Sequence, residues 1–334
     1  MFINFMKVLF FILLINPVYA FEQEPQNYSF TGVNDFKIVY SKFGNKRGVN
    51  GSLVISPGRA ESSLKHTETA LDFIELGFSP VYIINHRGQG FSQRALSNPH
   101  KGHVENFNYY HHDFQKFIEK VLQDPDTDVN NLFALSHSMG GAVLVSYLQH
   151  YKNPFKAVSM VAPMLGIKVD SEHATLFKTW VICYTPFAGD CNDYVPGGKD
   201  YDLSEVRFEG NKSTHSPERF QVKYDFWEKY PELQLGSATV RWVRESIQAN
   251  QFMRSKKKIA KIKDIPIFIV QAENDEVVEN AKQNIFCDRK NEVGKKNCDL
   301  VIIPDARHGI LIESDEIRQP AIDFIEAYFK SFSI

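Results

Sequence analysis

Apolar runs and amphipathic stretches alternate along most of the chain. Apolar runs rich in β-branched and aromatic residues predict strands, and they lie at 36–44, 51–58, 81–88, 131–136, 157–163, 265–273 and 299–306. Helical spacing of apolar positions appears at 108–122, 139–151 and 317–332. Continuous apolar strands separated by helices predict a mainly parallel sheet that is covered by helices on both faces.

The pattern changes between residues 164 and 255. This stretch has many aromatics and helix-like pieces, such as "YDFWEKYPEL" and "VRWVRESIQANQF", but no clear strand. We therefore predict an inserted, mostly helical cap at 164–255. The α/β core is then made of residues 21–163 and 256–334.

The first twenty residues differ from the rest of the chain. Lys7 precedes an unbroken apolar run, residues 8–15, and Pro17 is followed by Val18-Tyr19-Ala20. This order is typical of a cleaved secretory signal, and the apolar run is short for a bilayer span. We expect residues 1–20 to be a signal peptide and the mature protein to be periplasmic or secreted. A retained N-terminal membrane anchor is the alternative.

Composition and cysteines narrow the class further. The chain has 334 residues, 43% of them hydrophobic, and a formal net charge of −2, so a large core is possible and nothing indicates a nucleic-acid partner. An exported chain can keep disulfides. Of the three connectivities for four cysteines, we favour the local pairing Cys183–Cys191 and Cys287–Cys298, with four free thiols as the alternative. Neither spacing is that of a zinc knuckle.

The segment "LFALSHSMGGAVL" predicts a strand, a tight turn at Ser138 and a helix. Such a turn needs small residues two positions before and after the nucleophile, because a larger side chain would collide with the neighbouring elements. Gly140 and Gly141 meet this need, and Ser136 replaces the usual first glycine with the next-smallest choice. Ser136 as the nucleophile would lie deeper in the strand, so Ser138 is the better candidate.

A serine hydroxyl needs a base within hydrogen-bond reach, and the base needs a carboxylate that orients it. Asp275 follows the apolar run 265–273, and His308 follows the run 299–306. Both would lie at the same edge of the sheet as the serine, in the chain order serine, acid, histidine. Glu273 and Asp305 are the alternative acids. Asp275 could instead cap a following helix, and His308 could be an ordinary loop histidine.

An oxyanion hole would come from two backbone N–H groups. The residue after the nucleophile, Met139, supplies one. The strand at 51–56 ends in "PGRAES", so the N–H of Arg59 is the natural second donor, with Gly58 allowing the turn. An ordinary Pro-Gly turn is the structural alternative.

The loop "NHRGQG" at 85–90 lacks both the Lys-Ser/Thr of a P-loop and the spacing of a dinucleotide site. We expect a structural loop with Arg87 in a buried pair. His111 and His112 lie in a helical stretch with no third ligand nearby, so we expect no metal there.

Several segments resemble bacterial lysophospholipases, in the branch of serine α/β-hydrolases that also holds monoacylglycerol lipases. They are "SPGRAESSLKHTETALDFIELGFSPVYIINHRGQGFS", "GHVENFNYYHHDF", "THSPERFQVKYDFW", "VRWVRESI" and "ARHGILIESDEIR". The resemblance covers most of the chain from about residue 30 and implies an α/β-hydrolase fold with Ser138 as nucleophile, Asp275 as acid and His308 as base. Two departures are Ser136 and Pro57-Gly58, where related lipases often carry His-Gly.

These observations predict a serine hydrolase that cleaves carboxylic esters of single-chain lipids, lysophospholipid or monoacylglycerol, through an acyl-enzyme. A general carboxylesterase or peptidase, or a non-catalytic ligand-binding protein, remains possible on the same scaffold. We expect no cofactor, no metal and no nucleic acid, and possible peripheral membrane contact. Aromatics of the cap are expected to line an acyl-sized slot, and these are Phe177, Trp180, Phe187, Phe226 and Trp227.

Overall fold

The computed structural model describes residues 25–185, 188–262, 264–294 and 296–333. The predicted signal peptide at 1–20 lies outside these residues. The described strands form one eight-stranded sheet in the order β1-β2-β4-β3-β5-β6-β7-β8. The pairs β1–β2 and β2–β4 are antiparallel and all others are parallel. The strands are β1 (Gln26–Thr31), β2 (Lys37–Phe43), β3 (Gly51–Ser56), β4 (Phe78–Asn85), β5 (Leu132–His137), β6 (Val158–Val161), β7 (Ile267–Ala272) and β8 (Cys298–Ile303).

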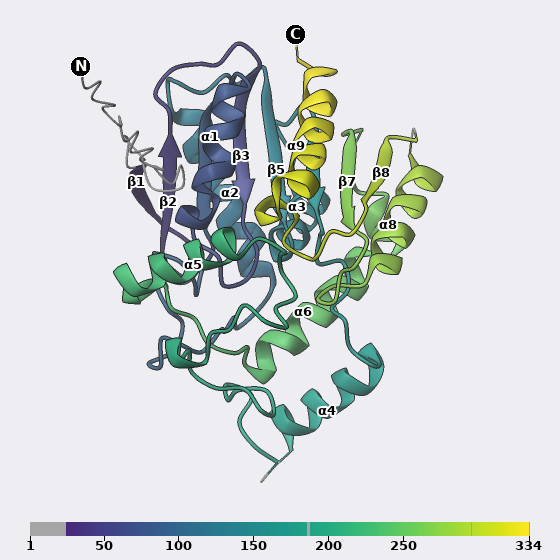
Figure 1. Cartoon of the computed structure of the whole chain (residues 1–334). Helices are drawn as coiled ribbons and strands as arrows, with labels where there is room; N and C mark the ends of the chain where they lie inside the picture. Colours follow the sequence, from purple (N-terminus) through teal and green to yellow (C-terminus); the bar gives the residue numbers. More distant parts are fainter. Residues whose placement is uncertain (1–24, 186–187, 263, 295, 334) are drawn as a thin grey trace, which may run out of the picture.

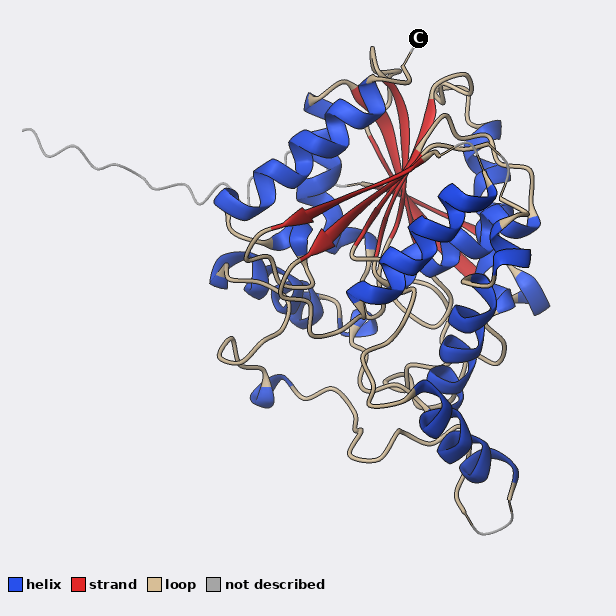
Figure 2. Cartoon of the chain, turned by 90° about the vertical axis from the view of Figure 1, so that its right-hand side faces the viewer, coloured by secondary structure: helices blue, strands red, loops and turns tan. Residues whose placement is uncertain are grey.

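Helices cover both faces of the twisted sheet (Figure 2). In β3, Val54 belongs to one buried cluster while Leu53 and Ile55 belong to the other, as the alternation of side chains along a strand requires. Helices α2, α3 and α8 pack on the first face, and α1 and α9 on the second. Their bounds are α1 (Thr67–Glu75), α2 (Asn108–Gln123), α3 (Met139–His150), α8 (Asn280–Val293) and α9 (Asp315–Lys330).

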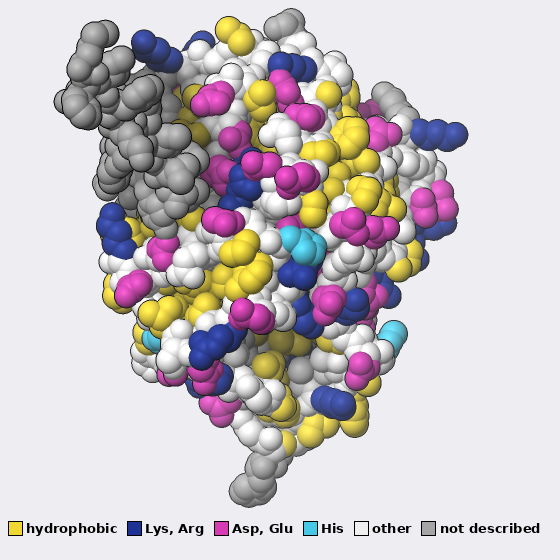
Figure 3. Space-filling view, in the orientation of Figure 1, with side chains coloured by type: hydrophobic (Ala, Val, Ile, Leu, Met, Phe, Trp, Pro, Cys, Tyr) yellow, Lys and Arg dark blue, Asp and Glu magenta, His cyan; other side chains and the backbone are white. Residues whose placement is uncertain are grey.

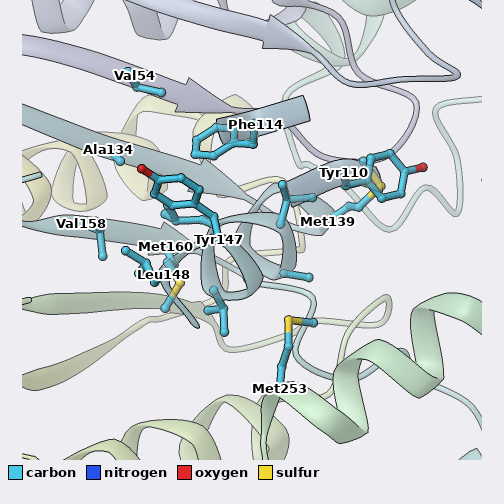
Figure 4. Close-up of a cluster of buried hydrophobic side chains, with 14 of the residues drawn as sticks. Val54, Tyr110, Phe114, Ala134, Met139, Tyr147, Leu148, Val158, Met160 and Met253 are labelled. Carbon is cyan, nitrogen blue, oxygen red and sulfur yellow. The ribbon is translucent and has the colours of Figure 1, made fainter. Parts of the chain in front are cut away.

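The larger buried cluster surrounds α3, which follows the serine turn. Tyr147 and Leu148 of α3 lie beside side chains of the neighbouring strands, including Ala134 and Val158 (Figure 4). Every residue of α3 from Met139 to Gln149 is buried. A helix that is buried all round is held firmly by packing, so the residue at its N-terminus is held in place as well.

All seven predicted strands and the three predicted helices are present, and the α/β-hydrolase fold is confirmed. The sequence missed β1, because most of its side chains are exposed and leave no apolar run. It also missed α1 and α8 as separate elements. The predicted pairing in the loop at 85–90 is present, since Arg87 Nε donates to Asp113 Oδ2 over 2.6 Å in a buried pair.

Between β6 and β7 the described residues form helices and no strand of the sheet. These helices are α4 (Glu172–Tyr184), α5 (Pro217–Lys229), α6 (Val240–Met253) and the short α7 (Lys256–Ile259). The first three fall inside the predicted cap at 164–255. In Figure 1, α4 and α6 lie below the sheet and α5 lies to the left, level with its lower end.

The four cysteines form the two local pairs that the sequence favours. Cys183 at the end of α4 is bonded to Cys191, and Cys287 of α8 is bonded to Cys298, the first residue of β8. One bond therefore lies in the cap region, and the other joins a helix to the edge strand of the sheet.

None of the helices described here has the length and apolar character that crossing a bilayer requires. On the face shown in Figure 3, charged side chains of both signs are interspersed with apolar ones.

Candidate active site

Ser138 occupies a strained turn between β5 and α3. The strand ends at His137, the helix begins at Met139, and Ser138 between them has φ 51° and ψ −119°. Positive φ is disfavoured for a residue with a side chain, and it persists only where surrounding structure enforces it. This is the backbone of a nucleophile elbow, which presents a serine hydroxyl at the edge of the sheet.

The neighbours of the elbow explain which residues it tolerates. A Cβ on Gly140 would lie 1.9 Å from the carbonyl oxygen of Ser56, and one on Gly141 would lie 2.5 Å from Cβ of Pro163. Neither position has room for a side chain. Ser136 is fully buried, and its Oγ lies 3.5 Å from the carbonyl oxygen of Ser159. The strand interior therefore has space and a polar neighbour for one hydroxymethyl group.

The three predicted site residues meet at this edge of the sheet. His308 Nε2 lies 2.8 Å from Ser138 Oγ, and His308 Nδ1 lies 2.8 Å from Asp275 Oδ2. Oδ1 of the same carboxylate accepts hydrogen bonds from the N–H groups of Val277 and Val278, at 2.8 and 2.9 Å. Asp275 thus closes the turn that follows it and contacts the histidine at once. It does not cap a helix, because α8 begins at Asn280 with Glu279 as its N-cap, so the alternative of a helix cap is wrong.

The alternative acids do not contact the histidine. The Glu273 carboxylate accepts a hydrogen bond from the N–H of Asp305 over 2.9 Å, which joins the two residues to each other at the surface. Asp275 is therefore the carboxylate that orients His308.

Burial and charge set the protonation of this pair. Burial lowers the pKa of His308 below its usual value, and the Asp275 carboxylate offsets only part of that effect. Burial alone would raise the pKa of Asp275, but the hydrogen bond and charge of His308 bring it below its usual value. At neutral pH the imidazole is neutral and can accept the serine proton, while the carboxylate is ionised.

The loop at 57–61 faces the serine and is held by Gln89. The Gln89 Nε2 group donates to the carbonyl oxygens of Gly58 and Glu61, at 2.7 and 3.0 Å, and its Oε1 accepts from the N–H of Ala60. The N–H of Gly58 donates to the Glu61 carboxylate over 2.5 Å. Of the N–H groups from 58 to 60, that of Arg59 is the one without a protein acceptor among the described residues, as the predicted oxyanion hole needs.

Met139 offers the second donor. It is the first residue of α3, where helical N–H groups have no partner within the helix. The positive end of the helix dipole also lies there and favours negative charge.

The sequence did not reveal the role of Glu61. Its buried carboxylate accepts hydrogen bonds from Gly58, from Lys65, from His66 Nε2 at 2.8 Å and from His137 Nδ1, which lies 3.0 Å from Oε1. Burial alone would raise the pKa of Glu61, but His137, Lys65 and His66 hold it well below its usual range. An ionised carboxylate thus connects the oxyanion loop to the residue before the nucleophile.

His137 extends this network to the histidine loop. Its Nε2 lies 3.1 Å from the carbonyl oxygen of His308. Glu61 and His137 together connect the oxyanion loop, the elbow and the histidine loop. No periodic signal marks Glu61, and only its position between the oxyanion loop and the next helix could have pointed to it.

Glu61, His66 and His137 place their polar atoms close enough together to suggest a metal site. A cation does not fit this group, because the Lys65 ammonium and the Gly58 N–H already donate to the same carboxylate. A metal ion would have to displace one of these donors from the carboxylate, and it would then lie close to the positive charge of Lys65.

Residues of the cap region hold the histidine loop from the other side. The N–H of His308 donates to the carbonyl oxygen of Lys212 over 3.3 Å, and that of Gly309 donates to Ser213 over 2.8 Å. The buried Glu313 carboxylate accepts from the N–H groups of His215 and Arg307, at 2.6 and 2.8 Å. These contacts fasten the segment at 212–215 to the loop that carries the histidine.

A cavity of about 320 Å³ opens over the serine. Its polar wall includes the loop at 59–61, Lys65 and Lys223. The apolar part of its lining consists of Ala60, Met164, Ile167, Trp242, Val277 and Val278. A volume of this order is typical of small-molecule sites.

The prediction that cap aromatics line this cavity is wrong for the four named aromatics that the structure describes, although Trp242 of α6, which also falls in the predicted cap, does line it. Phe177 and Trp180 of α4 are 67% and 45% exposed. Trp227 is buried in a separate cluster of α5, and Phe226 lines a different groove, against α1. Phe187 lies outside the described residues. Half of the apolar wall comes from other residues of the predicted cap, Met164, Ile167 and Trp242, and the other half comes from loops of the core. Helix α4, which carries Phe177 and Trp180, points away from the sheet (Figure 1).

The sheet order, the elbow and the cap region define an α/β-hydrolase. A family model of the serine aminopeptidases, S33, matches residues 48–315, and the chain belongs to this family. It is 33% identical over 321 residues to lysophospholipase L2 of Escherichia coli (strain K12), covering 94% of this chain and 90% of that protein. It is 31% identical over 309 residues to a probable lysophospholipase L2 of Haemophilus influenzae, covering 92% and 93%.

A solved structure agrees with this fold. A soluble variant of monoglyceride lipase from Saccharomyces cerevisiae, in complex with a substrate analog, matches with a TM-score of 0.71 at 17% identity. The match covers 93% of this chain and 96% of that one. The predicted resemblance to lysophospholipases and monoacylglycerol lipases is confirmed.

Proposed function

We propose that this protein is a serine hydrolase that cleaves the carboxylic ester of single-chain lipids, lysophospholipid or monoacylglycerol, through an acyl-enzyme. The observation that carries the proposal is the pair of 2.8 Å contacts, from Ser138 Oγ to His308 and from His308 to Asp275. The relatives named above, lysophospholipases and a monoglyceride lipase, support the same class of substrate.

The reaction follows from the geometry. His308 Nε2 takes the proton as Ser138 Oγ attacks the ester carbonyl carbon, and the N–H groups of Arg59 and Met139 stabilise the negative oxygen. Asp275 holds the imidazole in place and stabilises the imidazolium. The lipid alcohol leaves with the proton from His308. Water then attacks the acyl-enzyme, its proton goes to His308, and the fatty acid and free serine are released.

The charge of the cavity favours an ester over a peptide with a free amino terminus. An aminopeptidase needs a carboxylate to bind the substrate ammonium group. Among the described residues that line the cavity, Glu61 is the one carboxylate, and its oxygens already accept from four donors. Three cations, Arg59, Lys65 and Lys223, share the same lining and would repel an ammonium group.

The cap region offers a surface for contact with lipid. Phe177, Trp180 and Tyr184 of α4 are exposed and lie at helical spacing on one face, with ring centroids 6.4 Å apart for each neighbouring pair. Aromatic side chains are well suited to the membrane interface. We place this face against the lipid surface that supplies the substrate. In the same proposal the chain is exported by its N-terminal signal and acts outside the cytoplasm.

A release assay tests the function. Wild-type enzyme should release fatty acid from lysophospholipid or monoacylglycerol faster than from a diacyl phospholipid, and should not cleave peptide amides. A fluorophosphonate probe should label Ser138, because only an activated serine reacts readily. An unlabelled serine, or a clear preference for peptide amides, would contradict the proposal.

A further inference from the structure

One wall of the cavity over Ser138 carries more positive than negative charge. Arg59, Lys65 and Lys223 line it together with one carboxylate, that of Glu61. The Lys65 ammonium pairs with this carboxylate. The other two cations therefore have no carboxylate partner among the described residues of the lining.

Lys223 is the cation that is least compensated. It lies on α5, and its Nζ is 4.3 Å from the ring centroid of Trp227 and 5.2 Å from that of Tyr224. Within the part of the chain that the structure describes, its ammonium group makes no hydrogen bond or ion pair. Burial, together with the charges of Lys65 and Arg59, lowers the pKa of Lys223 to about 7.

Arg59 adds to the same positive field. Its Nη2 donates to the carbonyl oxygen of Gly236 over 2.7 Å, and its guanidinium lies 5.3 Å from the ring centroid of Trp242. Its Nε is buried with no hydrogen-bond partner in the described residues. Burial lowers the pKa of Arg59 to about 10, so the group stays charged at neutral pH.

A cation without a countercharge costs free energy in a partly buried place unless an anion joins it, and Lys223 and Arg59 are both partly buried. The proposed substrates differ in this respect. A monoacylglycerol is neutral, whereas a lysophospholipid carries a phosphate one glycerol backbone away from its ester. The next inference rests on the proposed function. We propose that Lys223 Nζ, supported by Lys65 and Arg59, binds the phosphate of a lysophospholipid whose ester carbonyl lies at Ser138. The site then selects lysophospholipid over monoacylglycerol.

The first arm of the test compares two substrates with the same acyl chain, a lysophosphatidylethanolamine and a monoacylglycerol. The Lys223→Met change keeps the length of the side chain and its packing on Trp227 but removes the charge. It should lower the ratio of kcat/KM for lysophospholipid to kcat/KM for monoacylglycerol by about tenfold or more, the loss expected for a charge-assisted hydrogen bond. Lys223→Arg should keep most of the ratio. Lys199→Met, which removes an exposed lysine of the cap region, is the matched control.

The second arm separates a lipid headgroup from free phosphate. Glycerol 3-phosphate and inorganic phosphate are added while the enzyme hydrolyses p-nitrophenyl butyrate. Glycerol 3-phosphate should inhibit the wild type competitively. Its inhibition constant should be about tenfold higher for Lys223→Met, as for the ratio between the two lipids. Strong inhibition by inorganic phosphate, together with an unchanged ratio between the two lipids in Lys223→Met, would assign the site to free phosphate and overturn the headgroup proposal.

Hydrolysis of p-nitrophenyl butyrate, a neutral ester, distinguishes a failure of the phosphate site from a failure of the proposed function. If the wild type hydrolyses p-nitrophenyl butyrate and the substrate ratio does not depend on Lys223, only the phosphate site is wrong. If the wild type hydrolyses no ester at all, the proposed function itself is wrong. A parallel loss of activity on both lipids in Lys223→Met, without a change in their ratio, would show a structural role and would also overturn the phosphate site.

Discussion

The carboxyl edge of the sheet and the cap region that faces it are built in different ways. At the edge, Ser138, Asp275 and His308 each follow a parallel strand, β5 and β7 buried and β8 at the side of the sheet, so the register of the sheet sets their relative positions. In the cap region the attachment varies, because α6 buries Trp242 and Met253 in the main core cluster, whereas α5 is held by side-chain pairs such as the Arg219 contacts with Glu68. The comparison leads us to expect that the sheet edge supplies the chemistry, and that the cap region, as proposed above, contributes to substrate selection.

The strongest test of this comparison removes the nucleophile. Ser138→Ala should lower kcat by a factor of about 10⁴ or more, because the triad acts as a unit, while the melting temperature changes little. Ser136→Ala is the matched control at the neighbouring buried serine and should keep most of the activity. If Ser136→Ala were inactive and Ser138→Ala were active, the nucleophile would be Ser136 and the assignment of Ser138 would be wrong.

The next test weakens the network that joins the loops. Glu61→Gln should lower kcat by about 10²-fold with a smaller effect on KM, because the contacts of the carboxylate position the oxyanion loop and His137. The matched control is Glu75→Gln at the exposed end of α1. Steady-state kinetics and thermal unfolding of both variants give the answer. A rise in KM with unchanged kcat would place Glu61 in substrate binding instead.

The pH dependence tests the histidine. Since burial lowers the pKa of His308, kcat/KM for a neutral monoacylglycerol should stay level from pH 8 down to the usual histidine value of about 6.5. It should then fall about tenfold per pH unit once the imidazole is protonated. A profile that already falls between pH 8 and 7 would contradict the lowered pKa, and a flat profile down to pH 4 would contradict His308 as the base.

The smallest effect is expected when a disulfide is removed, and the loss of stability should differ between the two disulfides. Both half-cystines of the pair Cys287–Cys298 are buried, and this pair fastens α8 to the edge strand. Replacing both by alanine should lower the free energy of unfolding by roughly 2–3 kcal/mol in the chain-entropy model, a few degrees in melting temperature. The same change at Cys183–Cys191 should lower the melting temperature less and raise KM. Calorimetry and kinetics on both double variants measure this, and a larger thermal effect of the cap pair would contradict it.

Sequence patterns predicted the sheet edge well because each site residue follows a strand that is apolar on both faces. Buried strands leave a continuous apolar run, and parallel strands end at one edge, so these patterns alone are enough to bring Ser138, Asp275 and His308 together. The edge strand β1 left no such signal, since most of its side chains are exposed.

The cap region and the supporting network could not be predicted in this way. Phe177 and Trp180 lie on a helix with apolar residues on several sides, so spacing alone did not show which side faces the core. Glu61 meets His137 across 76 positions of the chain, and such a contact depends on the fold rather than on any local pattern. Lys223 was missed for the same reason, because its neighbours Lys65 and Arg59 come from a distant loop.

The two hydrogen bonds between the histidine loop and residues 212 and 213 limit how the cap can be exchanged. A chimaera that receives the cap of another hydrolase loses the backbone that holds His308 unless it keeps this short segment. Engineered transplants should therefore retain 211–216 and replace the helices on either side of it. This short segment therefore belongs to the catalytic machinery although it lies in the predicted cap.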